Sequence, residues 1–524
     1  MEEEELLELD DIQGAIIPGF KKDHAALLYL RINDRAGCKA WLAEQAKEVA
    51  RADEVLCFNR LHRTMRSRRG SEVSAPKAVW TSISFSCEGL SILRSPEEVD
   101  TAFSFSDSFR DGMYQSALHD PPPSEWVLGG SPETLPHLLL IVEADDPKDL
   151  AREVKRLRAT VAPPGSRRNR ALTLMAPPQQ GATLPDPLTG HEHFGFRDGI
   201  SQPAVRGLAS TDPLNFVDER RLAPSDPNFE LFAEPGRPLV WPGQFVLGYK
   251  RQNRLELTKP SAPFQVKVPW QRNGSFLVYR RLQQKTYLFW IFCTEQANRL
   301  TPKLGRHVSA IDFATLLVGR WPSGAPLART PMGDDPTLAD DDNANNDFRF
   351  AEDTPRVTLA NGEIAGSAFP AAKADPNGLR CPFAAHIRKV NPRDDPSDTS
   401  GERQTKMRLM LRRGIPYGEA SAVPRPLEDD HVDRGLLFMS YQASLDAQFE
   451  FVTKTWVNRA NAPHDSDPQT GHDPLIGEDP TGSFVRLPID DEQIDLPDEP
   501  WVVMTGGGYF FTPSISALSG ALAE

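Results

Sequence analysis

The sequence predicts an α+β protein of two domains, each a β-sheet covered by helices on one face. Strand-like and helix-like segments follow one another in mixed order in both halves of the chain, which is the pattern of sheets packed against helices. The length of 524 residues is enough for two or more domain-sized units. A hydrophobic fraction of 39% and a charged fraction of 25% are typical of a soluble globular protein.

The first half of the chain holds three strand candidates and three helix candidates. The strands are expected where apolar residues alternate or run together, at 24–32, 80–86 and 138–144. The helices are expected where apolar residues recur at helical spacing, at 39–49, from Leu90 onward and at 147–157.

The second half repeats this pattern. Strands are expected at 245–249, 275–280 and 436–441. Helices are expected at 445–456 and at 310–321, the latter with an apolar side formed by Ile311, Phe313, Leu316 and Leu317.

Proline-rich segments separate these elements. The 47 prolines cluster at 121–136, 163–188, 212–242 and 322–336, which predicts long loops. We expect the domain boundary within 205–243 and therefore divide the chain into domains 1–220 and 221–524.

Charge and cysteine content restrict the partners and the compartment. The formal net charge of −14 argues against non-specific binding to nucleic acid or to an anionic membrane. No apolar run approaches the ~18 residues that a membrane span needs, and the first residues are acidic where a secretory signal would be basic and then apolar. Five cysteines without a Cys-x-x-Cys pair make a disulfide framework or a zinc site improbable. We expect a cytoplasmic protein.

The most informative short segment is Gly-Phe-Arg-Asp-Gly-Ile-Ser-Gln-Pro at 195–203. Its two glycines permit tight turns and a close approach of the backbone to a ligand, so that Asp198 is presented on an exposed bend. Taken alone, the segment favours an ordinary surface turn over a functional loop. His191 and His193 flank Glu192 just before it, and we expect them to shape the loop rather than bind a metal.

Two later segments add functional residue types. In 381–393, His386 follows an apolar Pro-Phe-Ala-Ala run that could wall a flat ligand, and it precedes Arg388 and Arg393, cations suited to carboxylates. In 411–418, Arg412 and Arg413 precede Gly-Ile-Pro-Tyr-Gly. A guanidinium is permanently charged and can stabilise developing negative charge.

Together these three segments resemble the dye-decolorizing peroxidases, a haem family, and they occur in the family's order. The segments 11–14, 274–282 and 506–513 are also similar to the family, so the resemblance spans nearly the whole chain. The length and the long loops resemble the larger branch of the family. The resemblance implies two ferredoxin-like domains that form a dimeric α+β barrel-type architecture with long loop insertions. Domain 1–220 would carry the Gly-Phe-Arg-Asp-Gly loop, and domain 221–524 would carry the haem ligand.

The resemblance also implies an activity. A peroxidase with haem b (iron protoporphyrin IX) would reduce hydrogen peroxide to water through a ferryl porphyrin radical. It would then oxidise dyes, phenolic compounds or other bulky donors one electron at a time. A haem-binding or haem-handling protein with incidental peroxidase activity is the first alternative, and a haem-free interaction protein is the second. Retention of a complete set of catalytic residue types favours the enzyme.

Each site residue is assigned from the family's motifs. His386 aligns with the axial iron ligand, Asp198 with the acid–base that moves the peroxide proton, and Arg412, preferred to Arg413, with the distal cation. The expected porphyrin contacts are Gly199, Ile200, Ser201, Arg388, Asn391, Pro392, Arg393 and Arg412.

Several questions stay open in the sequence. Asp446 and Glu450, on the helix expected at 445–456, are both candidates for a carboxylate that supports His386. The acidic stretch 341–352 has the spacing of a calcium loop but lacks the glycine at its sixth position. A surface radical site among Tyr417, Trp321, Trp456 and Trp501 is possible by residue type only, and packing is the better expectation for each. The physiological reductant and the oligomeric state are undetermined.

Overall fold

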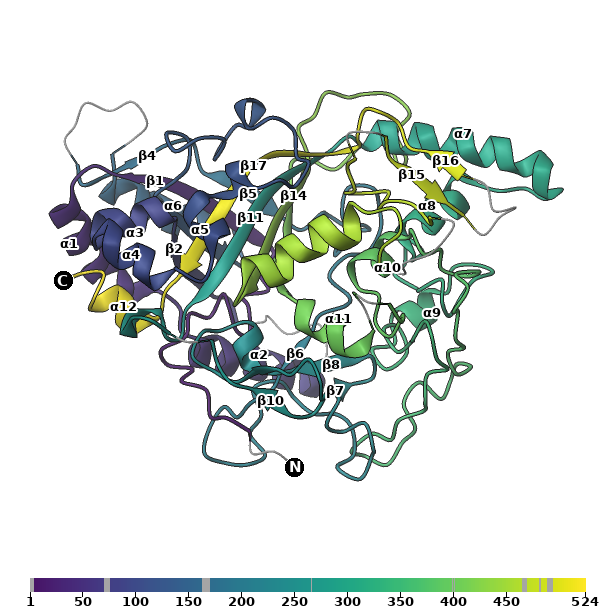
Figure 1. Ribbon diagram of the computed structural model, residues 1–524, viewed down its shortest axis with the longest axis horizontal. Coiled ribbons are helices and arrows are strands. Elements are labelled where there is room, and N and C mark those ends of the chain that lie inside the picture. Colours follow the sequence, from purple (N-terminus) through teal and green to yellow (C-terminus); the bar gives the residue numbers. More distant parts are fainter. Residues whose placement is uncertain are drawn as a thin grey trace.

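One large antiparallel sheet, built from both halves of the chain, organises the computed structural model (Figure 1). The structure describes residues 4–69, 76–162, 170–264, 266–397, 399, 401–463, 469–479, 482–487 and 493–524. Within these residues the sheet has ten strands, in the order β12-β14-β11-β17-β2-β3-β1-β4, with β13 beside β14 and β5 beside β1.

The sheet divides into two halves that follow the sequence. The N-terminal strands are β1 (His24–Ile32), β2 (Val79–Phe85), β3 (Leu138–Ala144), β4 (Leu172–Leu174) and β5 (Gln179–Ala182). The C-terminal strands are β11 (Ser275–Gln284), β12 (Leu411–Arg412), β13 (Ile415–Tyr417), β14 (Gly435–Gln442) and β17 (Val502–Thr512).

The two halves meet along two edges, so that the sheet closes into a barrel. On one side β17 pairs with β2 through Phe511 and Phe85. On the other side, β5 lies against β13, where a Cβ atom on Gly181 would stand only 2.8 Å from the side chain of Ile415. The glycine therefore permits the close approach of the two strands.

Alternating residues of each strand face either the barrel interior or the helices outside. In β1, Leu27 and Tyr29 belong to the interior core, where the Tyr29 hydroxyl lies 2.6 Å from that of Tyr279 on β11. Leu28 and Leu30 belong instead to the core beneath the outer helices. This period of two is the expected pleat of a strand.

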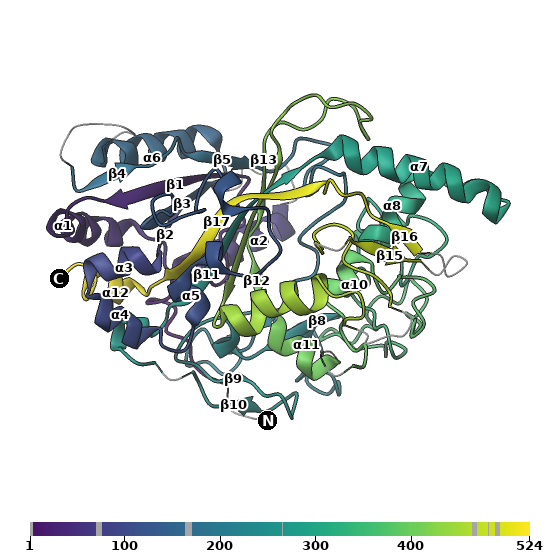
Figure 2. The same ribbon diagram turned by 45° about the horizontal axis from the view of Figure 1, so that its top comes forward.

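The helices lie outside the barrel in two groups (Figures 1 and 2). The N-terminal group contains α1 (Arg35–Gln45), α3 (Cys87–Leu93), α4 (Pro96–Ala102), α5 (Asp107–Asp111) and α6 (Pro147–Thr160), with α12 (Ile515–Ser519) beside it. Helix α2 (Ala52–Arg69) lies apart from this group and packs Val55 and Leu56 into the interior core. The C-terminal group contains α7 (Thr286–Leu304), α8 (Ala310–Val318), α9 (Pro336–Ala339), α10 (His386–Val390), α11 (Glu402–Arg408) and two consecutive π-helical stretches, η6 (Leu445–Glu450) and η7 (Val452–Val457).

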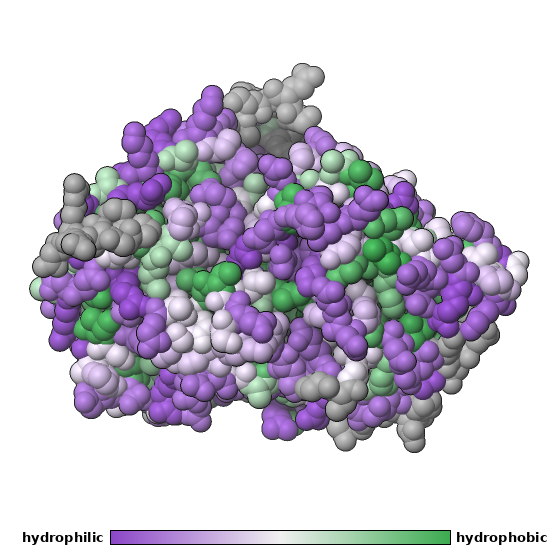
Figure 3. All heavy atoms as spheres, turned by 90° about the horizontal axis from the view of Figure 1, so that it is seen from above, coloured by the Kyte–Doolittle hydropathy of each residue, from purple (hydrophilic) through white to green (hydrophobic). Residues whose placement is uncertain are grey.

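Short elements occupy the long connections. The strands are β6 (Ala204–Val205), β7 (Phe232–Glu234), β8 (Arg237–Val240), β9 (Arg251–Gln252), β10 (Pro260–Ser261), β15 (Phe484–Arg486) and β16 (Gln493–Asp495). The 3₁₀ turns are η1 (Ala46–Glu48), η2 (Met113–Gln115), η3 (Pro123–Glu125), η4 (Pro242–Gln244) and η5 (Pro269–Gln271). No helix of the described residues is both long and apolar enough to cross a membrane. On the face seen in Figure 3, hydrophobic residues lie in small groups among hydrophilic ones.

Most predicted elements are confirmed, and one is wrong. The strand expected at 245–249 is a turn region that follows η4, because Gly248 has a φ of +97° that interrupts an extended chain. Its apolar side chains are buried without strand pairing. The helix expected at 310–321 ends at Val318, since Gly319 (φ +91°) caps it in the left-handed conformation. The sequence pattern missed α2, whose polar composition leaves no clear apolar face, and it also missed α7.

The predicted domain boundary at 220/221 lies in the long connection between β5 and β11, and it stays a prediction. Four aromatic residues, Phe289, Trp290, Phe292 and Phe313, pack together in the core around α7 and α8. The four candidates for a surface radical site are all buried, which favours packing: Tyr417, Trp321, Trp456 and Trp501.

Candidate active site

A deep cavity opens between the C-terminal half of the barrel, α10 and the π-helical turns of η7. Its volume is about 320 Å³, within the roughly 300–1,000 Å³ of small-molecule pockets. The loop carrying Asp198, the helix carrying His386 and the strand carrying Arg412 all contribute to its wall. The structure thus brings together three sequence segments that are far apart in the chain.

His386 is the first residue of α10 and lines the cavity. Its Nδ1 atom lies 2.8 Å from Oδ2 of Asp473, a carboxylate whose side chain is fully buried. The other oxygen of Asp473 accepts hydrogen bonds from the amides of Leu475 (2.9 Å) and Ile476 (3.1 Å). Because Nδ1 is bonded to the carboxylate, Nε2 is the ring nitrogen left for a metal.

The imidazole and the carboxylate shift each other's protonation. Burial lowers the pKa of the His386 imidazole, but the charge of Asp473 and its hydrogen bond to the ring together outweigh burial and leave that pKa above its usual value. Burial alone would raise the pKa of the Asp473 carboxyl. The charge and hydrogen bond of the His386 ring, together with the hydrogen bonds from the two amides, outweigh burial, so this pKa is lowered from its usual value. Asp473 therefore stays ionised and holds the proton of the ring on Nδ1.

Neither of the two carboxylates left open by the sequence supports His386. Asp446 accepts hydrogen bonds from Ser106 and Ser108. Glu450 accepts hydrogen bonds from Ser116 and Tyr509 and pairs with Lys454. Both residues lie on the π-helical segment after β14, but their side chains face the N-terminal half.

Sequence reasoning missed Asp473, which lies in a polar stretch around His472. The stretch also contains His464, Asp465 and Asp467, which lie outside the described residues. His472 itself pairs with Asp479 rather than with His386.

Asp198 and Arg412 form a second pair in the cavity. Asp198 stands between Gly195 (φ +92°) and Gly199 (φ +75°), two positions that favour glycine. Its Oδ1 atom accepts a hydrogen bond from the amide of Gly199 (2.6 Å) and lies 3.7 Å from Nη1 of Arg412. The Nη2 atom of Arg412 donates to the carbonyl of Ser201 at 2.7 Å. The guanidinium is thus held against the loop that carries the carboxylate.

The choice between the two arginines follows from their strand. Arg412 lines the cavity, whereas Arg413 donates to the carbonyls of Ala15 (3.2 Å) and Ile16 (2.8 Å) on the other side of the strand. Consecutive residues of an extended chain point in opposite directions.

The predicted porphyrin contacts divide into two groups. Gly199, Ile200, Ser201, Asn391 and Arg393 line the cavity with Arg412. The other two predicted contacts, Arg388 and Pro392, are not among the lining residues.

Arg388 has a different environment from the one expected. It is completely buried, and its guanidinium bonds the carboxylates of Asp395 and Asp375 and the carbonyl of Cys381. We therefore leave Arg388 out of the proposed haem contacts, because all its donors are directed to the protein itself.

The acidic stretch 341–352 organises the cavity's arginines. The side-chain oxygen of Asn345 accepts from Arg320 (2.7 Å), and that of Asn346 accepts from Arg320 (3.1 Å) and from Arg393 (2.6 Å). Within the described part of the chain, no group of three or more histidine, cysteine or acidic side chains could hold a metal ion. The stretch thus has a structural role, in positioning two arginines of the cavity.

Glu192 is a further cavity residue whose importance the sequence did not show. Its carboxylate accepts hydrogen bonds from the amides of Phe194 (2.8 Å) and Phe196 (2.9 Å) and from the side chain of Gln284 on β11. It thereby anchors the loop of Asp198 to the barrel. Burial raises the pKa of Glu192 to about 7 against these three donors.

The residues present fit a haem. The wall is mainly apolar, which suits the faces of a macrocycle, and His386 offers an uncommitted Nε2 to its iron. Arg320 and Arg393 line the same cavity and suit anionic substituents. Burial lowers the pKa of Arg320 to about 9 and that of Arg393 to about 10, so both remain cationic at neutral pH.

An α+β barrel whose apolar cavity holds a carboxylate-bound histidine and an aspartate–arginine pair defines a peroxidase of the haem-binding class. Comparison with known proteins agrees. Residues 11–167 match the family model of the DyP dimeric alpha+beta barrel domain, and residues 360–466 match that of the Dyp-type peroxidase C-terminal region. The chain belongs to the dye-decolorizing peroxidase family, and the predicted fold class is confirmed.

Individual relatives cover nearly the whole chain. A dye-decolorizing peroxidase of Mycetinis scorodonius is 30% identical over 99% of this chain and 88% of its own length. One of Exidia glandulosa is 31% identical over 99% of this chain and 87% of its own length. The crystal structure of a peroxidase of Auricularia auricula-judae matches with a TM-score of 0.73 and 28% identity, and an ancestral D-type member matches with a TM-score of 0.74 and 30% identity. Each match covers 99% of this chain and 100% of the solved one.

Proposed function

We propose that this protein is a peroxidase that uses haem b to reduce hydrogen peroxide to water and to oxidise dyes, phenols or other donors by one-electron steps. The observation that carries the proposal is the presence, in one cavity, of the His386–Asp473 pair and the Asp198–Arg412 pair. Bound haem would supply the iron that receives peroxide and the electron reservoir from which donors are oxidised.

Asp198 has a free oxygen with which to move a proton. Among the described residues, its Oδ1 accepts from Gly199 and faces Arg412, whereas no partner is recorded for Oδ2. Oδ2 can therefore take a proton from one oxygen of peroxide and return it to the other, so that the leaving oxygen departs as water. The side chain is 44% exposed, which allows peroxide or a bridging water to reach it.

Arg412 contributes fixed positive charge beside that proton transfer. Its Nη2 is held by the carbonyl of Ser201, and its backbone exchanges hydrogen bonds with the side chain of Gln202 (3.2 and 3.3 Å). The guanidinium is thus preorganised to stabilise the negative charge that develops as the O–O bond breaks. Glu192 holds the same loop from the opposite end.

In the other pair, Asp473 acts on its partner His386. By accepting the Nδ1 proton, it fixes the tautomer and orientation of His386 and makes Nε2 a better electron donor to iron. The apolar wall around the pair excludes water and lowers the local dielectric constant, which strengthens these interactions.

The relatives named as dye-decolorizing peroxidases support dyes as substrates. A haem-handling protein needs a ligand such as His386 but has no use for Asp198 or Arg412, and their placement in the cavity favours the enzyme. We also propose a cytoplasmic location, which the unpaired state of all five cysteines supports.

The test is Asp198→Ala, compared with the matched removal of an exposed carboxylate on the same long loop, Asp186→Ala. Haem content and peroxide reaction are measured by absorption spectroscopy, and dye turnover is measured in the steady state. We expect Asp198→Ala to bind haem normally and to react with peroxide roughly 10²–10⁴-fold more slowly, with Asp186→Ala unchanged. Unimpaired turnover in Asp198→Ala would refute the assigned role.

A further inference from the structure

Lys389 is a buried lysine on the helix that carries the proposed iron ligand. It stands three residues after His386 on α10, so the two side chains leave the helix on the same side. The whole residue is inaccessible to solvent. Because burial of an ammonium is costly unless its charge is compensated, a lysine in this position calls for a physical explanation.

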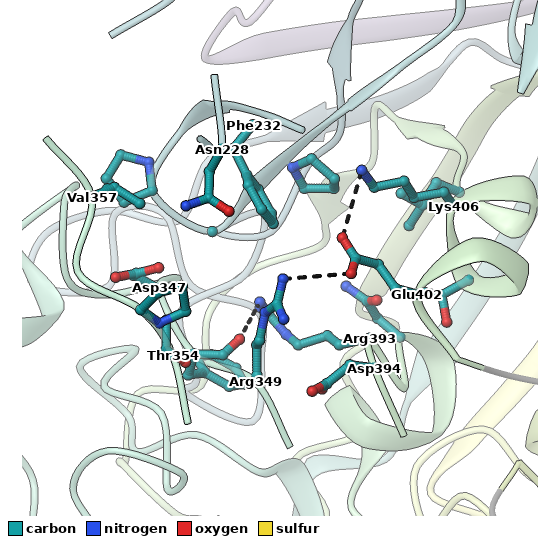
Figure 4. A pocket seen from close by; sticks show the side chains of 18 residues that line it. Asn228, Phe232, Asp347, Arg349, Thr354, Val357, Arg393, Asp394, Glu402 and Lys406 are labelled. Atoms are coloured by element: carbon teal, nitrogen blue, oxygen red, sulfur yellow. Dashed lines mark hydrogen bonds and ion pairs between the residues drawn. The ribbon is translucent and has the colours of Figure 1, made fainter. Parts of the chain in front are cut away.

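The other buried lysines of the described residues are compensated by carboxylates at close range. Nζ of Lys22 lies 2.7 Å from Oδ2 of Asp145. Nζ of Lys406 lies 3.8 Å from Oε1 of Glu402, and both residues line the narrow cavity shown in Figure 4. Both ion pairs cancel most of the lysine's charge where it arises.

Lys389 is held by neutral groups instead. Its Nζ atom donates to the backbone carbonyls of Arg459 (2.8 Å) and Ala462. Within the described part of the chain, no carboxylate forms an ion pair with it. Carbonyl oxygens satisfy the donors of an ammonium but carry no net charge, so the positive charge of Lys389 is felt by more distant groups.

The backbone that accepts these hydrogen bonds also holds the segment of Asp473. Within the stretch 457–462, the carbonyls of Val457 and Ala460 accept hydrogen bonds from three amides, those of Asp473 (3.1 Å), Thr470 (3.0 Å) and Gly471 (2.9 Å). Lys389 and Asp473 are therefore bound to the same stretch of backbone, which keeps the ammonium and the carboxylate in a fixed relationship.

The charges of Lys389 and Asp473 act on each other. Burial lowers the pKa of Lys389 to about 7, and the attraction of Asp473 opposes that shift. Burial also lowers the pKa of the adjacent His472, and the charge of Lys389 lowers it further. Since the ammonium and the carboxylate are both completely buried, little solvent screens their interaction. The ammonium thus offsets part of the negative potential that Asp473 exerts on the ring of His386.

This offset has a definite sign for bound haem. Asp473 makes His386 a stronger electron donor, which favours ferric over ferrous iron. A cation that offsets Asp473 works in the opposite direction and favours ferrous iron.

We propose that Lys389 is a positioning residue that acts through Asp473: its ammonium limits electron donation by His386 and keeps the midpoint potential of bound haem higher than the His386–Asp473 pair alone would set it. The inference rests on the proposed function, because it needs haem iron bound to His386. It assigns to Lys389 no contact with haem or with peroxide.

The experiment measures the ferric–ferrous midpoint potential of the haem-loaded protein by spectroelectrochemistry, without peroxide, at pH 6, where the ammonium is charged. We expect the potential of Lys389→Met to fall by about 59 mV, which is a tenfold shift in the ferric-to-ferrous ratio for one electron. Lys389→Arg keeps the cation and should keep the wild-type potential. Lys22→Met removes another buried lysine, in the N-terminal half, and should leave the potential unchanged.

Other outcomes would overturn the proposal. They are an unchanged potential in Lys389→Met and an equal fall in Lys389→Arg or in Lys22→Met. A rise in Lys389→Met would show that the lysine only anchors the segment of Asp473, because a displaced carboxylate leaves the imidazole less basic. If Lys389→Met does not fold, Lys389→Gln decides, since it keeps a donor for the carbonyls and loses the charge.

A double variant tests the route through Asp473. In an Asp473→Asn background the carboxylate is absent, so Lys389→Met should lower the potential by less than half as much as in the wild type. An undiminished fall would overturn this route. Because these measurements use no peroxide, a wild type that fails to react with peroxide would refute the proposed function and leave the role of Lys389 to be decided by the potentials.

Discussion

The Nδ1 atom of His386 donates its hydrogen to Oδ2 of Asp473 across 2.8 Å, although the two residues belong to separate segments of the C-terminal half. Asp473 is fully buried, and its second oxygen is held by two backbone amides. A carboxylate in this position fixes the ring and raises its basicity. How strongly His386 would bind iron therefore depends on a loop that lies far from it in the sequence.

Removing the charge of Asp473 tests this dependence. Asp473→Asn should weaken haem binding by roughly 10–100-fold and raise the ferric–ferrous midpoint potential, because a less basic imidazole stabilises ferric iron less. Haem titration and spectroelectrochemistry measure the two effects. Asp446→Asn is the control, since that exposed carboxylate accepts its hydrogen bonds, among the described residues, from two serines. A response in Asp446→Asn and none in Asp473→Asn would contradict our assignment.

Replacing each of the two neighbouring arginines should change a different property: the rate of the peroxide reaction for Arg412 and the stability of the fold for Arg413. Arg412→Ala should slow the reaction with peroxide by roughly 10²–10³-fold, as expected for loss of a preorganised donor. Arg413→Ala should instead lower the melting temperature, because the carbonyls of Ala15 and Ile16 lose their donors at about 1–3 kcal/mol each. Stopped-flow kinetics and thermal unfolding distinguish the two variants. A slow peroxide reaction in a folded Arg413→Ala protein would contradict the assignment of the catalytic role to Arg412.

Glu192 should make stability depend on pH near neutrality. Its folded-state pKa of about 7 lies above the ordinary 4.5, so between these values the folded protein keeps a proton that the unfolded chain has released. Stability from this group is therefore complete below pH 4.5 and is lost as the pH rises through 7. Glu192→Gln removes the titration. The melting temperature of the wild type should fall relative to that of the variant between pH 5 and pH 8; a constant difference would show that Glu192 does not titrate there.

Arg388 and Arg393 should respond in opposite ways to replacement by methionine. Arg388→Met leaves Asp375 and Asp395 buried without their cation, which costs roughly 3–5 kcal/mol and should lower the melting temperature most. Arg393→Met, in the cavity wall, should accelerate haem loss more than it destabilises the fold. Thermal unfolding and transfer of haem to an acceptor protein measure the two effects. Faster haem loss in Arg388→Met than in Arg393→Met would support the original prediction that Arg388 contacts haem.

The sequence was sufficient where local pattern decides the structure. The strands at 24–32 and 138–144 are confirmed to the residue, since their apolar side chains pack in period-two register against both cores. The apolar run at 245–249 misled the prediction because its side chains are buried by a turn, which periodicity alone cannot distinguish from a strand.

Side-chain contacts between residues that are distant in the chain could not be predicted from the sequence. Asp446 and Glu450 were natural candidates because they sit on a helix, but only the packing of that helix shows that they face Ser108 and Tyr509. Asp473 lies on a loop and gave no periodic signal. The family's motif already favoured Arg412 over Arg413, and the β12–β14 pairing adds the physical reason, because it fixes the side of the strand to which the Arg412 guanidinium points.

The most direct test of the whole account is an absorption titration of the haem-free protein with haem, followed by one equivalent of hydrogen peroxide, in the wild type and in His386→Ala. We predict that the wild type binds one haem with an intense Soret band that changes rapidly with peroxide and returns when a dye is added. His386→Ala should lose the histidine-ligated spectrum. An identical spectrum and peroxide response in His386→Ala, or a wild-type Soret band indifferent to peroxide, would contradict the central claim.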